Sequence, residues 1–176
     1  GSVLTDEGLN TLGEQNIGCA PLPWVIPQPM AMITNKKIDL FKSNTSHYQM
    51  MKDLQMQWKQ WSAENPAIFI TYNGHAFDEE LVRRQFFWNL LEPYTTNTNG
   101  NGRLDLMLMI HNIAAFFSDE ISMPLFEGGP GISYKLEHLA IEHGIDAGDA
   151  HDAIADCNLM IEMCRIIKER LPEVFQ

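Results

Sequence analysis

Two aspartates and a histidine gather near the carboxyl end of the chain, in a segment that reads AHDAIAD from Ala150 to Asp156. Asp152 and Asp156 are four residues apart, so on a helix they face the same side and repel each other by roughly 0.2–0.5 kcal/mol. A divalent cation would remove this repulsion, and His151 is near enough to act as general base on a metal-polarised water. The plainer interpretation is a solvated helix start, where the helix dipole already favours Asp149 and Asp152.

A further candidate, Asp78, follows the apolar run Ala67–Tyr72 and the short loop Asn73–Ala76. The β-branched and aromatic run is typical of a strand buried on both faces. Binding sites of open α/β sheets gather beyond the carboxyl ends of the strands, which is where Asp78 is expected. Its alternative role is to cap the helix that we predict from Phe77 to about Leu91.

Three more helices are predicted towards the carboxyl end. Asp105 lies at the start of a helix over Arg103–Phe117, where a cap or a first-turn carboxylate is expected. After a loop over residues 118–132, a short helix over Lys135–His143 ends at a glycine, the residue type that favours a helix end. We expect Asp149 to cap the last helix, which continues to about Arg170.

The amino-terminal part is less regular. Val3–Thr5 and Glu14–Cys19 are predicted as short strands around a turn at Asp6–Gly8, and four prolines between residues 21 and 29 favour an extended loop. Apolar residues then recur every three or four positions, which predicts an amphipathic helix over 45–63 with Thr45 or Ser46 as its cap. The aromatic residues of this helix could stack on bases, but packing in the core is the simpler role. A buried strand followed by helices indicates an α/β layered domain.

Composition and charge limit the possible functions. The chain has 176 residues, 45% of them hydrophobic and 20% charged, which is typical of one globular domain. No apolar run approaches the roughly 18 residues of a membrane span, and the start is not that of a signal peptide. Residues 71–176 hold 7 basic and 17 acidic side chains, a balance that opposes broad binding to a phosphate backbone. A small acidic site that recruits divalent cations and grips a few nucleotides is compatible with it.

The three cysteines, Cys19, Cys157 and Cys164, have no zinc-site or disulfide spacing. They fit the reducing cytoplasm, where we expect the protein to be. Gly1-Ser2 is typical of the remnant of a cleaved tag, which leaves residues 3–176 as the domain. The sequence carries no signal for an oligomeric state.

Four motifs in order give the chain a family resemblance. They are Ile70–Glu80, Arg103–Leu106, Tyr134–Leu139 and Ala150–Asp156. Together they resemble the DEDDh 3′→5′ exonucleases, and within that superfamily the nuclease domain of the bacterial exonuclease I family. The segment Ile26–Thr34 is also similar to a Pro-Gln-Pro segment of that family. The resemblance covers residues 3–176.

The resemblance implies a ribonuclease-H-like fold, with a central mixed sheet flanked by helices. It implies two magnesium ions, for which manganese can substitute, held by four acidic residues. Asp78 and Asp156 match two of these acids, and His151 matches the general base. The implied activity is removal of mononucleotides from the 3′ end of single-stranded DNA, with RNA as a possible alternative substrate. By position, the resemblance places Asn73 and Phe77 near the terminal nucleotides, and Lys135, where the family often has a basic residue, could meet a phosphate.

One family motif has no counterpart in the chain. The family carries an Asp-x-Glu on its first, central strand, and no such strand precedes Val3. We therefore expect residues 3–176 to be a partial exonuclease domain that lacks its first strand, binds metal poorly and hydrolyses DNA weakly or not at all. Open strand edges of such a domain could pair with another chain.

Two other interpretations stay open. His151-Asp152 also suggests a metal phosphohydrolase of the HD type, a class that is all-helical and needs further histidine ligands upstream. The strand predicted over 67–72 argues against that class. The second alternative is a catalytically incomplete nuclease-like module that binds nucleic acid and does not cut it.

Overall fold

The computed structural model describes residues 1–35, 38–148 and 152–175. In this part of the chain the strands form two separate pairs. β1 (Ser2–Thr5) and β2 (Thr11–Gln15) are antiparallel, with Val3 opposite Glu14. β3 (Ile68–Thr71) and β4 (Gly102–Asp105) are parallel, with Ile70 opposite Leu104. The sheet is therefore mixed in strand direction but divided between two pairs.

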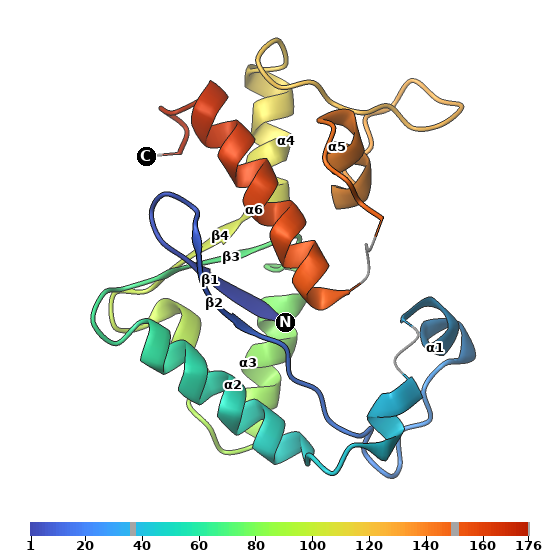
Figure 1. Cartoon of the computed structure of the whole chain (residues 1–176), viewed down its shortest axis with the longest axis vertical. Coiled ribbons are helices and arrows are strands. Elements are labelled where there is room, and N and C mark those ends of the chain that lie inside the picture. Colours follow the sequence, from blue (N-terminus) through green and yellow to red (C-terminus); the bar gives the residue numbers. More distant parts are fainter. Residues whose placement is uncertain (36–37, 149–151, 176) are drawn as a thin grey trace.

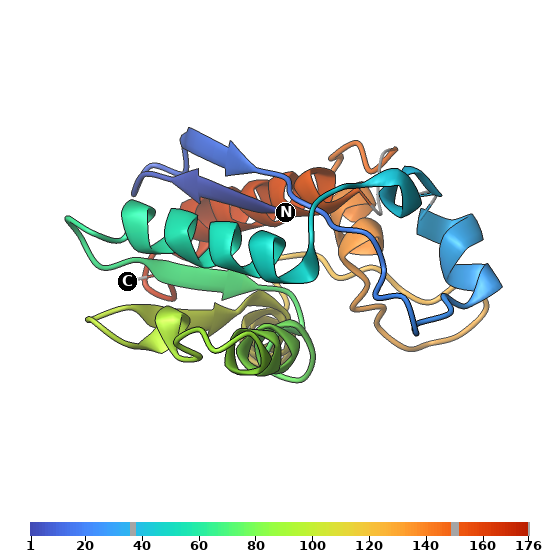
Figure 2. The ribbon, with the colours of Figure 1, turned by 90° about the horizontal axis from the view of Figure 1, so that it is seen from below.

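Both views of the ribbon place the four strands in the spatial order β2, β1, β3, β4 (Figures 1 and 2). β1 and β3 are thus the inner strands, and in the described residues no ladder joins them. One side chain contacts both pairs: the Trp58 ring donates from Nε1 to Ser2 Oγ at 3.1 Å and packs edge-on against Phe69 at 5.2 Å. The two strand pairs therefore share one supporting helix.

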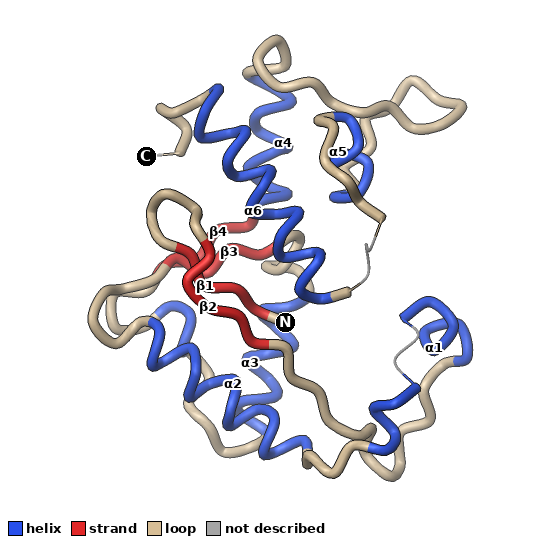
Figure 3. The backbone as a smooth tube through the Cα atoms, viewed as in Figure 1, coloured by secondary structure: helices blue, strands red, loops and turns tan. Residues whose placement is uncertain are grey.

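Helices cover the strands on two sides (Figure 3). α2 (His47–Trp61) and α3 (Asp78–Trp88) lie on one side. The helices α4 (Leu106–Phe116), α5 (Leu136–Glu142) and α6 (Ala153–Arg170) lie on the other. The remaining helical elements are α1 (Pro29–Asn35) and two 3₁₀ turns, Ile38–Lys42 and Thr95–Asn97. Among the described residues, no helix is long and apolar enough to cross a membrane.

The main core lies between α4, α5 and α6. Its fully buried members on these helices are Leu106, Ile110 and Ile113 of α4, Leu139 of α5, and Met163, Cys164 and Ile167 of α6. Burying each side chain of this size contributes about 1.5–3 kcal/mol to folding. A second cluster forms on α2, where Trp58 packs against Phe69 and Phe86. This confirms core packing as the role of that tryptophan.

Several predicted elements are confirmed. The strand over 67–72 and the amphipathic helix after residue 45 are present, and the helix is capped by Ser46, whose Oγ accepts from Gln49 N at 3.1 Å. The turn after β1 is closed by Asp6, which accepts from the backbone of Asn10 at 2.8 Å. Gly144 ends the short helix α5 with φ +74°, a left-handed conformation that favours glycine.

Other predictions were wrong in their boundaries. Arg103–Asp105 is the strand β4, and only the residues after it are helical, because Leu104 pairs opposite β3. The second strand begins at Thr11 and ends at Gln15, which leaves 16–19 as loop. α1 was not predicted, because the prolines up to residue 29 favoured a loop. Pro29 stands at the first helical position, where proline is tolerated.

The strand β3 is also more open than predicted. Ile68 is 69% exposed, and the other residues of the strand are half-buried. The expected burial on both faces requires neighbouring elements on every side, and in the described residues β3 pairs with β4 alone. The apolar run therefore predicted the strand correctly and its surroundings incorrectly.

The three cysteines are free and differ in exposure. Cys164 is 2% exposed, and burial raises the pKa of its thiol to about 12. Burial also raises the pKa of the Cys19 and Cys157 thiols, but both are partly exposed, so we expect a thiol reagent at pH 8 to modify these two slowly in the native protein and Cys164 only after unfolding. The folded Cys164→Ala variant should likewise show two reactive thiols. Three thiols that react at equal rates in the native protein would contradict the buried position.

The same pKa shift has a consequence for stability at alkaline pH. The thiol form of Cys164 is favoured by folding, so its contribution to stability is complete below the ordinary thiol pKa of about 8.5. It is lost progressively as the pH rises towards the folded pKa of about 12.

Candidate functional site

The site is built around the loop that follows β3. Asn73 adopts φ +59°, a left-handed conformation that asparagine tolerates better than most residues. Gly74 is buried, and a Cβ there would lie 2.1 Å from Thr71 Oγ1, so no larger residue fits. The Gly74 carbonyl then accepts from Phe77 N at 3.2 Å and Glu79 N at 2.9 Å. These contacts turn the chain from β3 directly into α3.

Asp78 is the first residue of α3 and does not cap it. The cap position is Phe77, whose side chain makes no capping hydrogen bond. The prediction of a capping aspartate was therefore wrong by one position, because the tight turn at Gly74 starts the helix with backbone bonds of its own. The Asp78 carboxylate therefore does not serve as the helix cap, and Asp78 is an exposed residue at the end of the loop.

The surroundings of Asp78 make its charge costly. Loss of hydration is the largest cause that raises the pKa of Asp78, and the nearby carboxylates of Asp105 and Glu79 raise it further. The positive amino terminus of Gly1 opposes this shift. A carboxylate whose charged form is disfavoured gains most from a bound cation, which supplies the missing positive charge.

The second acidic segment lies at the start of α6. Asp152 caps the helix by accepting from Ile154 N at 3.3 Å, and Asp156 occupies its first turn. The expected cap Asp149 and the candidate base His151 lie outside the described residues. The structure thus gives the capping role to Asp152, one of the two aspartates that the spacing singled out.

Asp78 and the start of α6 both lie near Gly1, the residue before β1. A Cβ on Gly1 would lie 3.0 Å from Ala153 Cβ, and the Gly1 carbonyl accepts from Cys157 Sγ at 3.8 Å. Gly1 also interacts electrostatically with Asp78. In Figure 1 the amino terminus lies between the first turns of α3 and α6. Asp78 and the first turn of α6, which holds Asp156, therefore both lie near Gly1, although Asp78 and Asp156 are 78 positions apart in the sequence.

A charged network that the sequence did not indicate lies beside the loop. The side chain of Glu79 is only 7% exposed, and its carboxylate accepts from Arg103 Nη1 at 2.6 Å and lies 3.3 Å from His75 Nε2. These residues border a polar cavity of about 280 Å³. His75 and Glu79 are four residues apart and could have been paired from the sequence, but Arg103 comes from the neighbouring strand.

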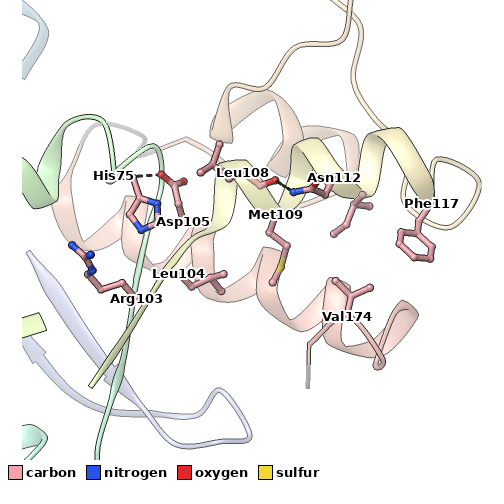
Figure 4. Close-up of a pocket in the computed structure, with 10 residues that line it drawn as sticks. His75, Arg103, Leu104, Asp105, Leu108, Met109, Asn112, Phe117 and Val174 are labelled. Atoms are coloured by element: carbon pink, nitrogen blue, oxygen red, sulfur yellow. Dashed lines mark hydrogen bonds between the residues drawn. The ribbon is translucent and has the colours of Figure 1, made fainter. Parts of the chain in front are cut away.

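Asp105 is the most buried carboxylate near the site. It is 3% exposed, and it caps α4 by accepting from Met107 N at 3.1 Å, as the sequence predicted. It also accepts from Asn73 N at 2.9 Å and from His75 N at 3.1 Å, contacts that the sequence did not predict. An open, mostly apolar groove of about 340 Å³ runs from Asp105 along α4 (Figure 4). Neither Asp78 nor Asp156 lines this groove.

The candidate nucleotide contacts lie around the same loop. Phe77 is 60% exposed, and Asn73 is exposed as well. The Lys135 side chain is 62% exposed and lies 3.8 Å from Glu137. Tyr72 donates from Oη to the Tyr134 carbonyl at 2.6 Å, which ties the start of the loop to the residue before Lys135. The three side chains are thus available to a ligand, and their role stays a prediction.

The donor set suits a hard divalent cation, but it is small. Carboxylate oxygens are the ligands that magnesium and manganese prefer. Among the residues that the structure describes, no three of His, Cys, Asp and Glu gather closely enough to hold a metal ion. Asp78 and Asp156 fit two places of a carboxylate site, and further ligands must complete it.

Comparison with known proteins gives consistent matches. No protein-family model matches the chain. Exodeoxyribonuclease I of Escherichia coli K12 is 28% identical over 192 residues, which cover 99% of this chain and 36% of that protein. Exodeoxyribonuclease I of Haemophilus influenzae is 36% identical over 118 residues, which cover 66% of this chain and 24% of that protein. The chain therefore spans well under half the length of these relatives.

Solved structures match over nearly the whole chain. The zinc-bound complex of E. coli exonuclease I with single-stranded DNA superposes with a TM-score of 0.86 at 26% identity, covering 98% of this chain and 36% of that one. The complex of the same enzyme with a dA16 oligonucleotide gives a TM-score of 0.87 at 27% identity, covering 98% of this chain and 37% of that one. These matches confirm the predicted fold class, an α/β domain of the ribonuclease-H-like type, and exclude the all-helical alternative.

Proposed function

Because this chain is homologous to bacterial exonuclease I, we propose that it forms the core of a metal-dependent nuclease that removes mononucleotides from the 3′ end of single-stranded DNA. One observation carries the proposal furthest. Asp78 and the first turn of α6, which holds Asp156, flank the same terminus in a chain that superposes on exonuclease I over 98% of its length.

Each candidate residue has a distinct task in this proposal. The carboxylates of Asp78 and Asp156 bind divalent cations, magnesium being the physiological choice and manganese a substitute. Bound cations stabilise the charge on the attacking and leaving oxygens of the phosphodiester. His151 accepts the proton of the attacking water, the general-base role that histidine most often performs in enzymes. Lys135 offers a positive charge to a phosphate.

The loop after β3 supports the terminal nucleotides. The exposed ring of Phe77 offers a flat apolar face for stacking on a base, and the amide of Asn73 offers donors and an acceptor to a sugar or base edge. The acidic balance of residues 71–176 disfavours a long contact with the DNA backbone. We therefore infer that this chain grips only the last few nucleotides.

The metal site needs carboxylate ligands besides Asp78 and Asp156, and an additional strand can supply them. β1 and β3 are neighbouring inner strands from different pairs, and Trp58 contacts both of them. Unpaired inner edges accept a further strand by backbone hydrogen bonds. We propose that a strand carrying Asp-x-Glu pairs between β1 and β3 and completes the metal site. A version of this chain preceded by such a strand is called the extended form below.

The proposed function is tested with labelled oligonucleotides. The extended form is incubated with single-stranded DNA and RNA, labelled at the 3′ or the 5′ end, with magnesium or with a chelator. We expect 3′-labelled DNA to release mononucleotides from the earliest time point, and only with magnesium. Internal cleavage would contradict an exonuclease, and binding without cleavage would favour the alternative of an incomplete nucleic-acid-binding module.

A further inference from the structure

The carboxylate of Asp105 joins two elements that meet at the site. Oδ1 accepts from Asn73 N at 2.9 Å and from Met107 N at 3.1 Å, and Oδ2 accepts from His75 N at 3.1 Å. Figure 4 shows the bond to His75 beside the apolar wall of α4. The residue is 3% exposed, so these backbone groups replace the water that an ionised carboxylate would otherwise bind.

Asp105 makes contacts that join the loop after β3 to α4. The left-handed residue of this loop, Asn73, is not a glycine, so this conformation carries a cost that neighbouring contacts offset, although asparagine tolerates it better than most residues. Two of the Asp105 bonds bracket Gly74, the residue whose carbonyl starts α3. Asp78 lies three residues after His75. A shift of the backbone from Asn73 to His75 therefore also displaces the Asp78 carboxylate.

We propose that Asp105 is a positioning residue, which clamps the backbone of Asn73 and His75 to the start of α4 and thereby fixes where the Asp78 carboxylate meets a cation. The inference rests on the proposed metal-binding role of Asp78. It adds a buried acid, which does not itself touch metal or substrate, to the machinery of the site.

The chemistry of the clamp explains why the residue is an aspartate. An ionised carboxylate only accepts hydrogen bonds, so both of its oxygens can face backbone N–H groups. In Asp105→Asn the amide oxygen can keep the bonds to Asn73 and Met107, while the amide NH₂ faces the N–H of His75. This variant retains the helix cap and selectively loses the bond at His75.

The test measures the clamp and the metal site separately in this 176-residue chain. Backbone amide hydrogen exchange reports the bonds at His75 and Met107, and broadening of the Asp78 and Asp156 amide signals by Mn²⁺ reports cation binding. Asp105→Asn is compared with the unmodified chain and with Ser46→Ala. The latter removes the cap of α2, a helix end whose Oγ bond involves none of the loop residues.

We expect Asp105→Asn to speed exchange at His75 at least about tenfold, with Met107 still protected, and to weaken Mn²⁺ binding about tenfold, the lower end of the effect of losing a group that orients a metal ligand, because Asp105 acts on Asp78 only through the loop backbone. Ser46→Ala should change neither. Unchanged exchange at His75, or faster exchange with unchanged Mn²⁺ binding, would overturn the positioning role. Because this chain holds only part of the site, Mn²⁺ is added in large excess; if the Asp78 signal then stays unchanged in both the unmodified chain and the extended form, Asp78 is not a cation ligand, and the positioning role falls with it.

Discussion

The substitution Asp156→Asn is expected to slow the release of 3′ nucleotides by the extended form about a thousandfold. A metal ion that stabilises the reacting phosphate contributes several kcal/mol to lowering the barrier, and about 4 kcal/mol corresponds to a thousandfold in rate. Asn keeps the shape of the side chain but loses the charge that holds the cation. Asp156 lies in the first turn of α6 outside the buried core, so the helix is expected to fold normally.

The measurement is the initial rate on 3′-labelled single-stranded DNA at saturating magnesium. Glu173→Gln is a matched control, because it also converts a carboxylate to an amide and lies in an exposed residue just beyond the opposite end of α6. The control should retain the full rate. A rate for Asp156→Asn within a few-fold of the unmodified protein would remove Asp156 from the site.

The second large effect concerns the additional strand. We expect this chain alone to hydrolyse single-stranded DNA at least about a hundredfold more slowly than the extended form, because its described residues hold no group of three metal ligands. Its free energy of unfolding should also be lower, since in the part of the chain that the structure describes no ladder pairs the facing edges of β1 and β3.

A matched control separates the two consequences of the added strand. An extended form with Asn-x-Gln in place of Asp-x-Glu keeps the backbone pairing and lacks the carboxylates. It should recover the stability of the extended form, measured by urea unfolding, without recovering hydrolysis. Equal rates for this chain and the extended form would show that residues 1–176 already contain a complete site.

Local patterns were sufficient to predict some of the elements around the site. The apolar periodicity of α2 and the β-branched run of β3 depend on neighbouring residues, and both predictions were confirmed. The strand β4 was not predicted, because its four residues continue directly into an apolar helix and show no alternation of their own. Only pairing with β3, more than 30 positions away, makes them a strand.

The contacts within the site depend on longer separations. Asp105 was correctly predicted as a helix cap, because its partner Met107 is two residues away. Its bonds to Asn73 and His75 span 32 and 30 residues, and no local pattern encodes them. The roles of His151, Asp78 and Asp156 as base and metal ligands were derived from the family resemblance and stay predictions.

The most direct test is a crystal structure of the extended form with Mn²⁺, which is located by its anomalous scattering. We expect one manganese peak shared by carboxylate oxygens of Asp78 and Asp156, or two adjacent peaks, each within about 2.0–2.6 Å of one of them, as hard cations require. Manganese bound to neither carboxylate, or carboxylates turned to opposite sides of the molecule, would contradict the nuclease site.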